Sequence, residues 1–319
     1  MQVAIDIDGP LVTCRAVGTG ITHQFVALTS AFRVTGPLPP GRVTYGIGDA
    51  NYGVREPDGF DGLSLDASEE ARRVRIQDTL LRALQSVPGV EVSLTIASCL
   101  RDALANGADP AAELRESAVV RRPTPANVRI RSALSYPRTL AAFLDWMNDD
   151  AGSLRTDRHG SNTAIYVDVG SNLTTIARLG VDDDAVDPAS TRTLDSGWVQ
   201  LAMALEDGLR ENHAMGAVRP EVVANILLAG GYRIRGRHQR ADALIAEAAE
   251  PLAADIRSQL MEFGGTDPII VVGLPALHVA ALLADTLDRP VLTPDDPAFA
   301  NVRGLLKYAA VVTSQGDSA

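Results

Sequence analysis

The sequence predicts an α/β protein built from two domains. Its 319 residues correspond to two domains at roughly 150 residues each. Two short apolar segments, Val3 to Gly9 and Ala164 to Gly170, each run through an aspartate into a glycine turn, and they open the two halves of the chain. Stretches with a helical spacing of apolar residues alternate with strand-like segments. The 46% hydrophobic and 22% charged residues are those of a folded globular chain.

The first half continues from its aspartate turn into a strand-like segment, Leu11 to Val17. Apolar residues at helical spacing predict helices over Glu69 to Leu84 and Thr139 to Met147, with a strand over Val90 to Ala97 between them. The polar, turn-rich segment Gly152 to Asn162 then marks the approach to the second domain.

The second half repeats the plan of the first, because its aspartate turn leads into a strand over Thr174 to Leu179. A helix is expected from about Gly197 to Leu209. The stretch Ala241 to Phe263 is also helical in spacing, but we expect Pro251 to break or kink it, since proline removes a helical hydrogen bond. The remaining elements are the strand Ile269 to Val272 and the helix Ala276 to Leu287.

Charge and composition exclude several classes of protein. The formal net charge of -11 argues against broad DNA binding, because sequence-independent binding needs a basic surface that displaces phosphate counterions. The two cysteines, Cys14 and Cys99, lack metal-ligand spacing and are too few for a disulfide framework, which favours a reducing cytoplasm. The N-terminal residues do not resemble a signal peptide, and polar residues interrupt both long uncharged stretches, so no membrane span is expected. Lys307 is the only lysine.

The two aspartate turns are the first candidate site. An aspartate at the end of a buried strand can hold a hydrated Mg²⁺, while the N–H groups of the following glycine turn face a phosphate. The turns Asp6 to Gly9 and Asp168 to Ser171 would then grip one nucleotide from both sides. Each turn alone is also compatible with an ordinary hairpin, since Asp-Gly is a common hairpin signal. Their pairing at the starts of two halves favours the nucleotide.

Two further segments carry a resemblance to a known family. Val167 to Thr175 looks like the Asp-x-Gly-x-x-x-Thr phosphate loop of the actin-like ATPases. Near the C-terminus, Asp296 to Tyr308 closely resembles their Pro-x-x-Ala-Asn-x-x-Gly segment. The chain therefore resembles this superfamily, and within it the bacterial plasmid-segregation group typified by ParM and StbA.

The resemblance implies the actin fold, with domain I over 1–155 plus 300–319 and domain II over 156–299 on either side of a nucleotide cleft. ATP and Mg²⁺ would lie in the cleft, and hydrolysis would be coupled to assembly of the protein into filaments. In the ParM group the filament moves plasmids through an adaptor bound to centromere DNA. The acidic charge of this chain fits that division of labour, because the adaptor, and not the filament, contacts DNA.

The same resemblance implies a set of site residues. Asp6 and Asp168 would hold the metal, and Asp168 would also act in catalysis. The residues implied to bind the nucleotide are Asp6, Asp8, Gly9, Arg15, Gly170, Ser171, Thr174 and Gly273.

Several positions depart from the family pattern. Asp8 stands where a glycine is usual, and Thr13 stands where actins carry a phosphate-binding lysine. Arg15 lies two residues further along the same strand face and would supply the missing charge, unless it is a solvated strand residue. On the adenosine side, only Gly273 matches a run of three glycines.

The position of the catalytic base also departs from the pattern. The family often has a Pro-Glu pair before the helix that precedes the second phosphate loop, whereas this chain has Pro137 and Arg138. Asp145 is the only acid in the apolar stretch of that helix, so we interpret it as the candidate catalytic residue, with a solvated helix face as the alternative.

An arginine-rich run over 232–240 is either a contact for another subunit, an adaptor or phosphates, or a solvated loop. Two other functions remain open. One is a sugar- or cofactor-kinase of the same superfamily that does not polymerise, and the other is a degenerate scaffold that binds nucleotide weakly.

Overall fold

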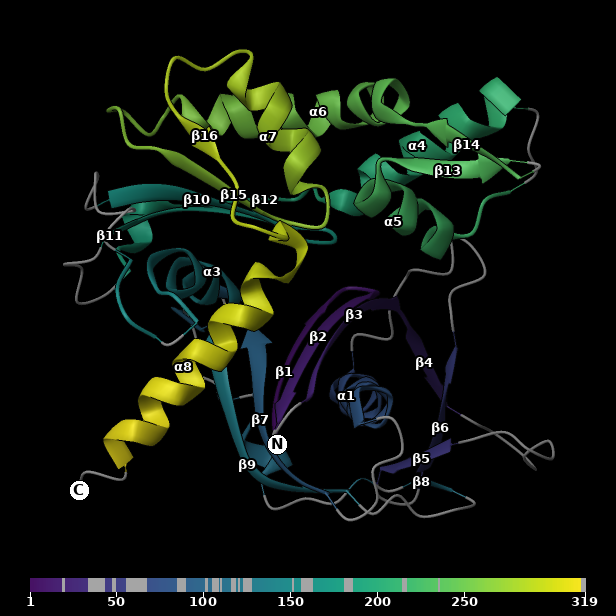
Figure 1. The fold of residues 1–319 in the computed structure, drawn as a ribbon, viewed down its shortest axis with the longest axis vertical. Coiled ribbons are helices and arrows are strands. Elements are labelled where there is room, and N and C mark those ends of the chain that lie inside the picture. The colour runs from purple at the N-terminus through teal and green to yellow at the C-terminus, as the bar shows by residue number, and fades with distance from the viewer. Residues whose placement is uncertain are drawn as a thin grey trace.

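The chain folds around two five-stranded sheets. The computed structural model describes residues 1–18, 21–33, 44–47, 50–55, 68–84, 90–100, 103–104, 109, 111–115, 119, 121–122, 128–150, 152–155, 163–180, 186–213, 217–234 and 236–316. Figure 1 shows the two sheets in opposite halves of the molecule, with helix α8 crossing from one half to the other.

The first sheet has the strand order β3-β2-β1-β7-β9. Its strands are β1 (Gln2–Asp8), β2 (Leu11–Gly18), β3 (Ile21–Leu28), β7 (Val90–Ser98) and β9 (Val128–Pro137). The first three form an antiparallel meander, and β7 and β9 run parallel to β1. Helix α1 (Glu69–Leu84) covers one face, where Val3 and Ile5 lie in a buried cluster with Ile76 and Leu80.

The second sheet repeats this plan with the order β12-β11-β10-β15-β16. Its strands are β10 (Thr163–Val169), β11 (Thr174–Gly180), β12 (Thr191–Leu194), β15 (Ile269–Gly273) and β16 (Val291–Leu292). One face packs against α4 (Trp198–His213), α5 (Pro220–Ala229), α6 (Asp242–Leu260) and α7 (Ala276–Ala284). The same hairpin-plus-parallel-strand unit therefore forms the centre of both sheets.

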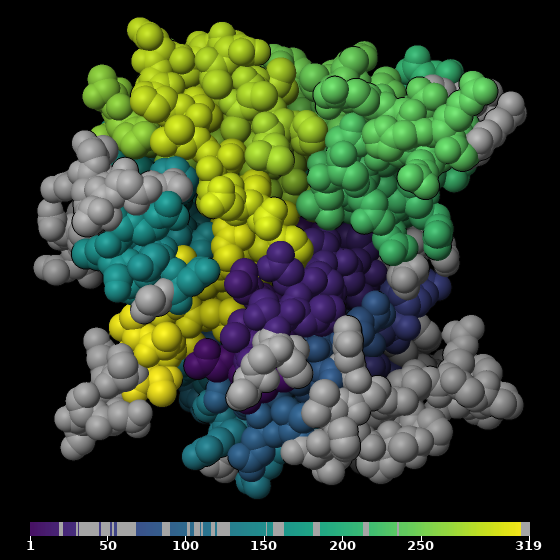
Figure 2. All heavy atoms as spheres, viewed as in Figure 1, coloured from purple at the N-terminus to yellow at the C-terminus, as the bar shows by residue number. Residues whose placement is uncertain are grey.

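Two helices fill the space between the sheets. Helix α3 (Arg138–Met147) packs on the inner face of the second sheet, and α8 (Ala300–Gly316) packs on β1 and β7 of the first. The helices touch where a Cβ on Gly304 would lie 1.7 Å from the carbonyl oxygen of Ala141. Only glycine permits this approach. Figure 2 shows the N-terminal strands in purple directly beside the yellow C-terminal segment.

Smaller elements extend this core. A four-stranded sheet beside α1 has the order β4-β6-β5-β8, formed by β4 (Ser30–Arg33), β5 (Thr44–Ile47), β6 (Ala50–Arg55) and β8 (Arg121–Arg122). A separate hairpin consists of β13 (Gly231–Ile234) and β14 (Arg237–Arg240). Short 3-10 turns lie at Ala112–Leu114, Pro188–Ser190 and Pro297–Phe299.

Most predicted elements are confirmed, and the expected break at Pro251 needs correction. Helix α6 runs unbroken through Pro251, because Ala248, Ala249 and Leu252 on either side are buried in the core, and this packing outweighs the lost hydrogen bond. The arginine-rich run forms the hairpin β13–β14, whose second strand is exposed, and Arg235 lies outside the described residues.

Part of the predicted approach to the second domain, 156–162, also lies outside the described residues, next to the proposed boundary at 155. No helix in the described part of the chain is both long and apolar enough to span a bilayer.

Candidate functional site

The alternation of side chains along β1 and β10 directs two aspartates into the layer between the sheets. On β1, Val3 and Ile5 face α1, whereas Ala4 faces α8. Asp6 is two residues beyond Ala4 and shares its face. On β10, Tyr166 lies in the cluster that contains α3, so Asp168 faces α3 in the same way. Both carboxylates are buried, with exposures of 5% and 2%.

Asn301, in the first turn of α8, joins the two carboxylates. Its Nδ2 donates to Asp6 Oδ2 at 3.0 Å and lies 3.4 Å from Asp168 Oδ1. Thr139 of α3 donates its hydroxyl to Asp168 Oδ2 at 3.1 Å. Both inner helices therefore contribute to one site between the sheets. We call this site the cleft. It is lined by Asp6, Asp8, Leu11, Thr13, Arg138, Asp168, Val169, Gly170, Gly273, Leu274, Ala298 and Asn301.

The N-terminus of α4 holds the second aspartate turn in place. The backbone N–H of Trp198 donates to Gly170 O at 2.9 Å, and that of Val199 donates to Ser171 O at 3.0 Å. The fully buried Trp198 indole also donates to Ser171 Oγ at 3.0 Å. The carbonyl oxygen of Ser171 accepts a hydrogen bond from α4. The backbone N–H of Ser171 points the other way, toward the first turn.

The first turn closes directly onto the second. A carboxylate oxygen of Asp8 accepts the backbone N–H of Ser171, and the Ser171 hydroxyl donates to the carbonyl oxygen of Asp8. Gly9 has a φ of 54°, and a Cβ there would lie 2.7 Å from Ser171 Cβ. Glycine is therefore required at position 9 both for its backbone conformation and for the contact between the turns.

Arg138, the first residue of α3, is the one guanidinium among the described residues that lines the cleft. Its Nη1 lies 2.7 Å from Asp8 Oδ2, and its Nη2 lies 3.6 Å from Asp6 Oδ1. Pro137 precedes it and provides an extended N-cap, φ -61°, so the helix begins beside the carboxylates. Arg138 thus stands at the helix start where the family pattern has an acid.

The cleft carries an excess of negative charge. Burial, opposed by Arg138 and reinforced by Asp6 and Asp8, raises the pKa of Asp168 to about 7. Burial likewise raises the pKa of Asp6. Burial alone would lower the pKa of Arg138, but the three carboxylates outweigh it and raise that pKa. A cation in the cleft would relieve the repulsion among these carboxylates.

The residues of the cleft fit a hydrated divalent cation. Asp6 Oδ1 and Asn301 Oδ1 are buried acceptors that have no hydrogen-bond partner among the described residues. Buried acceptors normally have partners, and water molecules around Mg²⁺ would donate to both. Within the described part of the chain, no group of three His, Cys, Asp or Glu side chains is placed to hold a metal directly, so contact through water is the arrangement that fits.

Gly273 lines the cleft at the end of β15. Gly273 ends β15 with a φ of 107°, and a Cβ there would lie 2.3 Å from the carbonyl oxygen of Val169. Thr174, predicted to bind nucleotide, instead donates its hydroxyl to Ser196 O at 2.8 Å and is fully buried. It stabilises the second turn and does not line the cleft.

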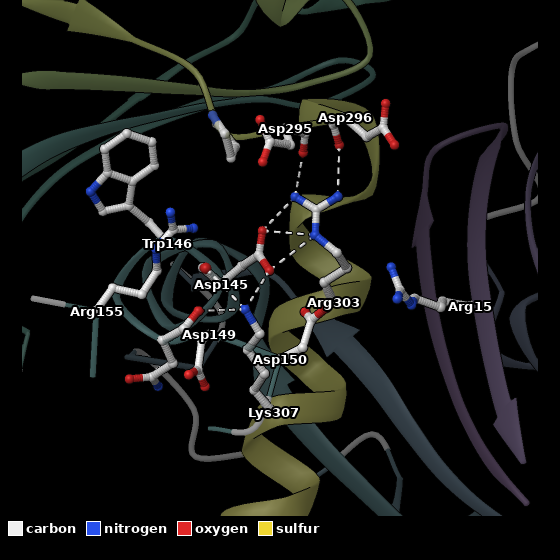
Figure 3. A pocket seen from close by; sticks show the side chains of 12 residues that line it. Arg15, Asp145, Trp146, Asp149, Asp150, Arg155, Asp295, Asp296, Arg303 and Lys307 are labelled. Atoms are coloured by element: carbon white, nitrogen blue, oxygen red, sulfur yellow. Dashed lines mark hydrogen bonds and ion pairs between the residues drawn. The ribbon is translucent and has the colours of Figure 1, made fainter. Parts of the chain in front are cut away.

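Two predicted residues lie elsewhere. Arg15 and Asp145 line a second pocket, between the end of α3 and α8 (Figure 3). Arg15 shares a strand face with Thr13 but is displaced from it along β2 by two residues, about 7 Å, and its Nη1 donates to Gln24 Oε1 at 3.2 Å. This corrects the prediction that Arg15 supplies the missing phosphate-binding charge.

Asp145 belongs to an ion cluster that we define by Asp145, Arg303 and Lys307. Arg303 Nε lies 3.0 Å from both carboxylate oxygens of Asp145, and Lys307 Nζ lies 2.9 Å from Oδ1. About two helical turns, roughly 10 Å, separate Asp145 from Arg138 on α3. This corrects the interpretation of Asp145 as the catalytic residue, because its carboxylate is already bound by two cations outside the cleft.

Three residues of the site were missed at the level of sequence. Asn301 lies inside the family-like C-terminal segment, which indicated its importance without its partner. Arg138 was noticed only as the absence of an acid. Trp198 gave no signal, because an apolar residue at the start of a helix is ordinarily part of the core.

Comparison with known proteins places this geometry in a known fold. No protein-family model and no curated protein sequence matches the chain. Solved structures match over nearly its whole length. The actin-like protein Alp7A gives a TM-score of 0.71 at 10% identity, covering 99% of this chain and 98% of Alp7A.

Two other solved structures of similar fold contain a bound nucleotide or come from a filament. The archaeal actin homolog Ta0583, in complex with ADP, gives a TM-score of 0.65 at 15% identity and covers 97% of this chain and 99% of Ta0583. A ParM from a 15-stranded filament of Clostridium botulinum gives 0.63 at 14% identity, covering 97% and 99%. The likeness shows that the chain has the actin fold and confirms the predicted fold class.

Proposed function

From this actin fold, we propose that the protein binds ATP with Mg²⁺ in the cleft and assembles into filaments whose stability depends on the bound nucleotide. The observation that carries the proposal is the meeting of two aspartate turns, one from each sheet, at Asn301 of α8. An ADP complex and a filament among the solved structures of similar fold support the same reading.

Each group in the cleft has a chemical role in this proposal. Asp6 and Asp168 would hold Mg²⁺ through its water shell, and the Ser171 N–H would bind a phosphate oxygen. When bound, Mg²⁺ would neutralise phosphate charge and so assist hydrolysis. Asp168, whose pKa burial raises to about 7, would orient and deprotonate the attacking water at its carboxylate. Gly273 would let the backbone approach the adenosine.

Assembly would follow from the relative position of the domains. We assign 1–155 plus 300–319 to domain I and 156–299 to domain II. A head-to-tail contact that does not close on itself generates an open helix. A nucleotide that favours one angle between the domains would favour one form of that contact, since a ligand shifts an equilibrium toward the state it binds better.

Plasmid segregation is the cellular role that we propose for the filament. The formal charge of -11 disfavours direct, broad DNA binding, so an adaptor bound to centromere DNA would connect filament and plasmid. The exposed arginine-rich hairpin β13–β14 is a candidate contact for a neighbouring subunit or for the adaptor.

Sedimentation and light scattering test the proposal. The protein would be compared with Mg-ATP, Mg-GTP, Mg-ADP, ATP plus EDTA, and no nucleotide, over a range of concentrations. We expect polymer above a critical concentration that is lowest with the Mg-triphosphate. A monomer under every condition that phosphorylates a small acceptor would favour the kinase, and a monomer without turnover would favour the scaffold.

A further inference from the structure

Asp8 occupies the place in the cleft where an anionic ligand would be expected. Its carboxylate accepts the N–H of Ser171 in a glycine turn and lies 2.7 Å from the guanidinium of Arg138. A turn N–H and a guanidinium are both donors that proteins commonly use to bind phosphate oxygens. In this chain both donors are directed at one of its own side chains.

The position of Asp8 allows its side chain to leave. Asp8 is the last residue of β1, and its side chain is 18% exposed, whereas that of Asp6 is 7% exposed. Asp6 is held by Asn301 within the inner layer. A rotation of the Asp8 side chain toward solvent would free the Ser171 N–H and one edge of Arg138 without moving either backbone.

An anion can bind beside Arg138 only after the Asp8 side chain has moved away, because the carboxylate would repel it. Asp6, Asp8 and Asp168 place three carboxylates around the guanidinium of Arg138, while Arg72 and Arg75 act on Asp6 and Asp8 from outside the cleft lining. A phosphate next to Asp8 would meet a like charge within a few ångströms in a partly buried site, where water screens the repulsion only weakly. When the Asp8 side chain moves away, one of these negative charges leaves the cleft, and Nη1 of Arg138 becomes available to an anion.

We infer that Asp8 is an internal substitute for a nucleotide phosphate, and that Arg138, once released from Asp8, is the cation that binds that phosphate in place of the lysine absent at Thr13. The inference rests on the proposed function, because it specifies how the same cleft admits its nucleotide. Arg138 suits this role, since a guanidinium stays charged and can bind two phosphate oxygens at once. Arg15 does not line the cleft.

The closed arrangement should weaken nucleotide binding. When the binding-competent state is a minor fraction of the molecules, the apparent affinity falls by that fraction. A variant that keeps the shape of Asp8 but not its charge should therefore bind phosphate-bearing ligands more tightly. The opposite result is expected for a carboxylate that helps to hold Mg²⁺, because removing its charge would weaken nucleotide binding.

The test is calorimetric titration of the full chain with Mg-ADP, Mg-ATP and pyrophosphate. Asp8→Asn is compared with the wild type, and Asp267→Asn is the matched control, because Asp267 pairs with Arg178 at 2.9 Å away from the cleft. We expect Asp8→Asn to tighten binding about tenfold or more and Asp267→Asn to leave it unchanged. Equal or weaker binding by Asp8→Asn would overturn the inference.

A second variant pair isolates Arg138. In the Asp8→Asn background, Arg138→Gln should weaken binding of all three probes by about tenfold or more, whereas Arg178→Gln should not. Near-ultraviolet circular dichroism verifies that each variant is folded. Unchanged affinity in the folded Arg138 variant would overturn its assignment.

The outcomes separate this inference from the proposed function. If wild type and variants bind nucleotide with one affinity, Asp8 and Arg138 do not act as inferred, and the proposed function stands. If no form binds any nucleotide, the proposed function fails and the inference fails with it.

Discussion

Helices α3 and α8 enclose two buried sets of charges that differ in their balance. In the ion cluster, one carboxylate meets two cations, and Lys307 Nζ also donates to Asp145 O and Asn148 O at 3.1 and 2.7 Å. In the cleft, three carboxylates surround the guanidinium of Arg138, and two acceptors have no hydrogen-bond partner among the described residues. The first set is complete without a ligand. The second is not, and this incompleteness is typical of a binding site.

The largest expected effect is a loss of stability when the ion cluster, the set that is complete without a ligand, is broken. Asp145→Ala would leave Arg303 and Lys307, whose side chains are 12% and 9% exposed, without their counterion. Breaking a buried pair from one side costs about 3–5 kcal/mol. Urea denaturation should show this loss, and Asp150→Ala, at an exposed position of the same segment, should change stability by less than about 0.5 kcal/mol. A stable Asp145→Ala protein would remove the contrast between the two sets.

The contact between the helices gives the next effect. Gly304→Ala would place a Cβ 1.7 Å from Ala141 O, so α3 and α8 must separate. Overpacking of this kind costs about 1–3 kcal/mol. Gly264→Ala, where a Cβ meets nothing within 4 Å, is the control. If the separation also reaches the cleft, nucleotide affinity should fall in Gly304→Ala, which would show that the two sets are coupled through the helices.

Asp168→Asn should have opposite effects on stability and on hydrolysis. The raised pKa of Asp168 means that its contribution to stability is complete below pH 4 and is lost as pH rises through about 7. In EDTA, where Mg²⁺ is absent, the stability of the variant relative to that of the wild type should therefore rise by up to about 4 kcal/mol between pH 4 and pH 8, measured by denaturation at each pH. Mg²⁺-dependent phosphate release should be abolished. Unchanged release would remove Asp168 from the catalytic site.

The smallest effect is expected at Arg15. Because its side chain contacts Gln24 and lies outside the cleft, Arg15→Ala should leave the affinities for Mg-ATP and Mg-ADP unchanged. Its effect on stability should stay below about 0.5 kcal/mol. Selective loss of ATP affinity would restore Arg15 as the substitute for the missing lysine.

Local sequence patterns were sufficient to predict much of the fold. Helix α1 coincides with the predicted range Glu69 to Leu84, and both aspartate turns join two strands as predicted, with Asp6 opposite Thr13 and Asp168 opposite Thr175. Alternation along a strand is a local property, so the shared face of Asp6 and Ala4 could be deduced directly.

What failed were judgements that depend on distant partners. Asp145 looked catalytic as the single acid of an apolar helix stretch, yet its partners Arg303 and Lys307 lie about 160 residues further along the chain. Asn301 reaches Asp6 across 295 residues, and Pro251 is tolerated because its neighbours pack against other elements. No spacing within a short segment carries this information.

The burial of Lys307 has a practical consequence for labelling. It is the only lysine of the chain, and its amine is bonded to three oxygens. An amine-reactive fluorophore should therefore modify Lys307 far more slowly in the folded protein than in the unfolded chain, so that labelling of this one side chain reports on unfolding.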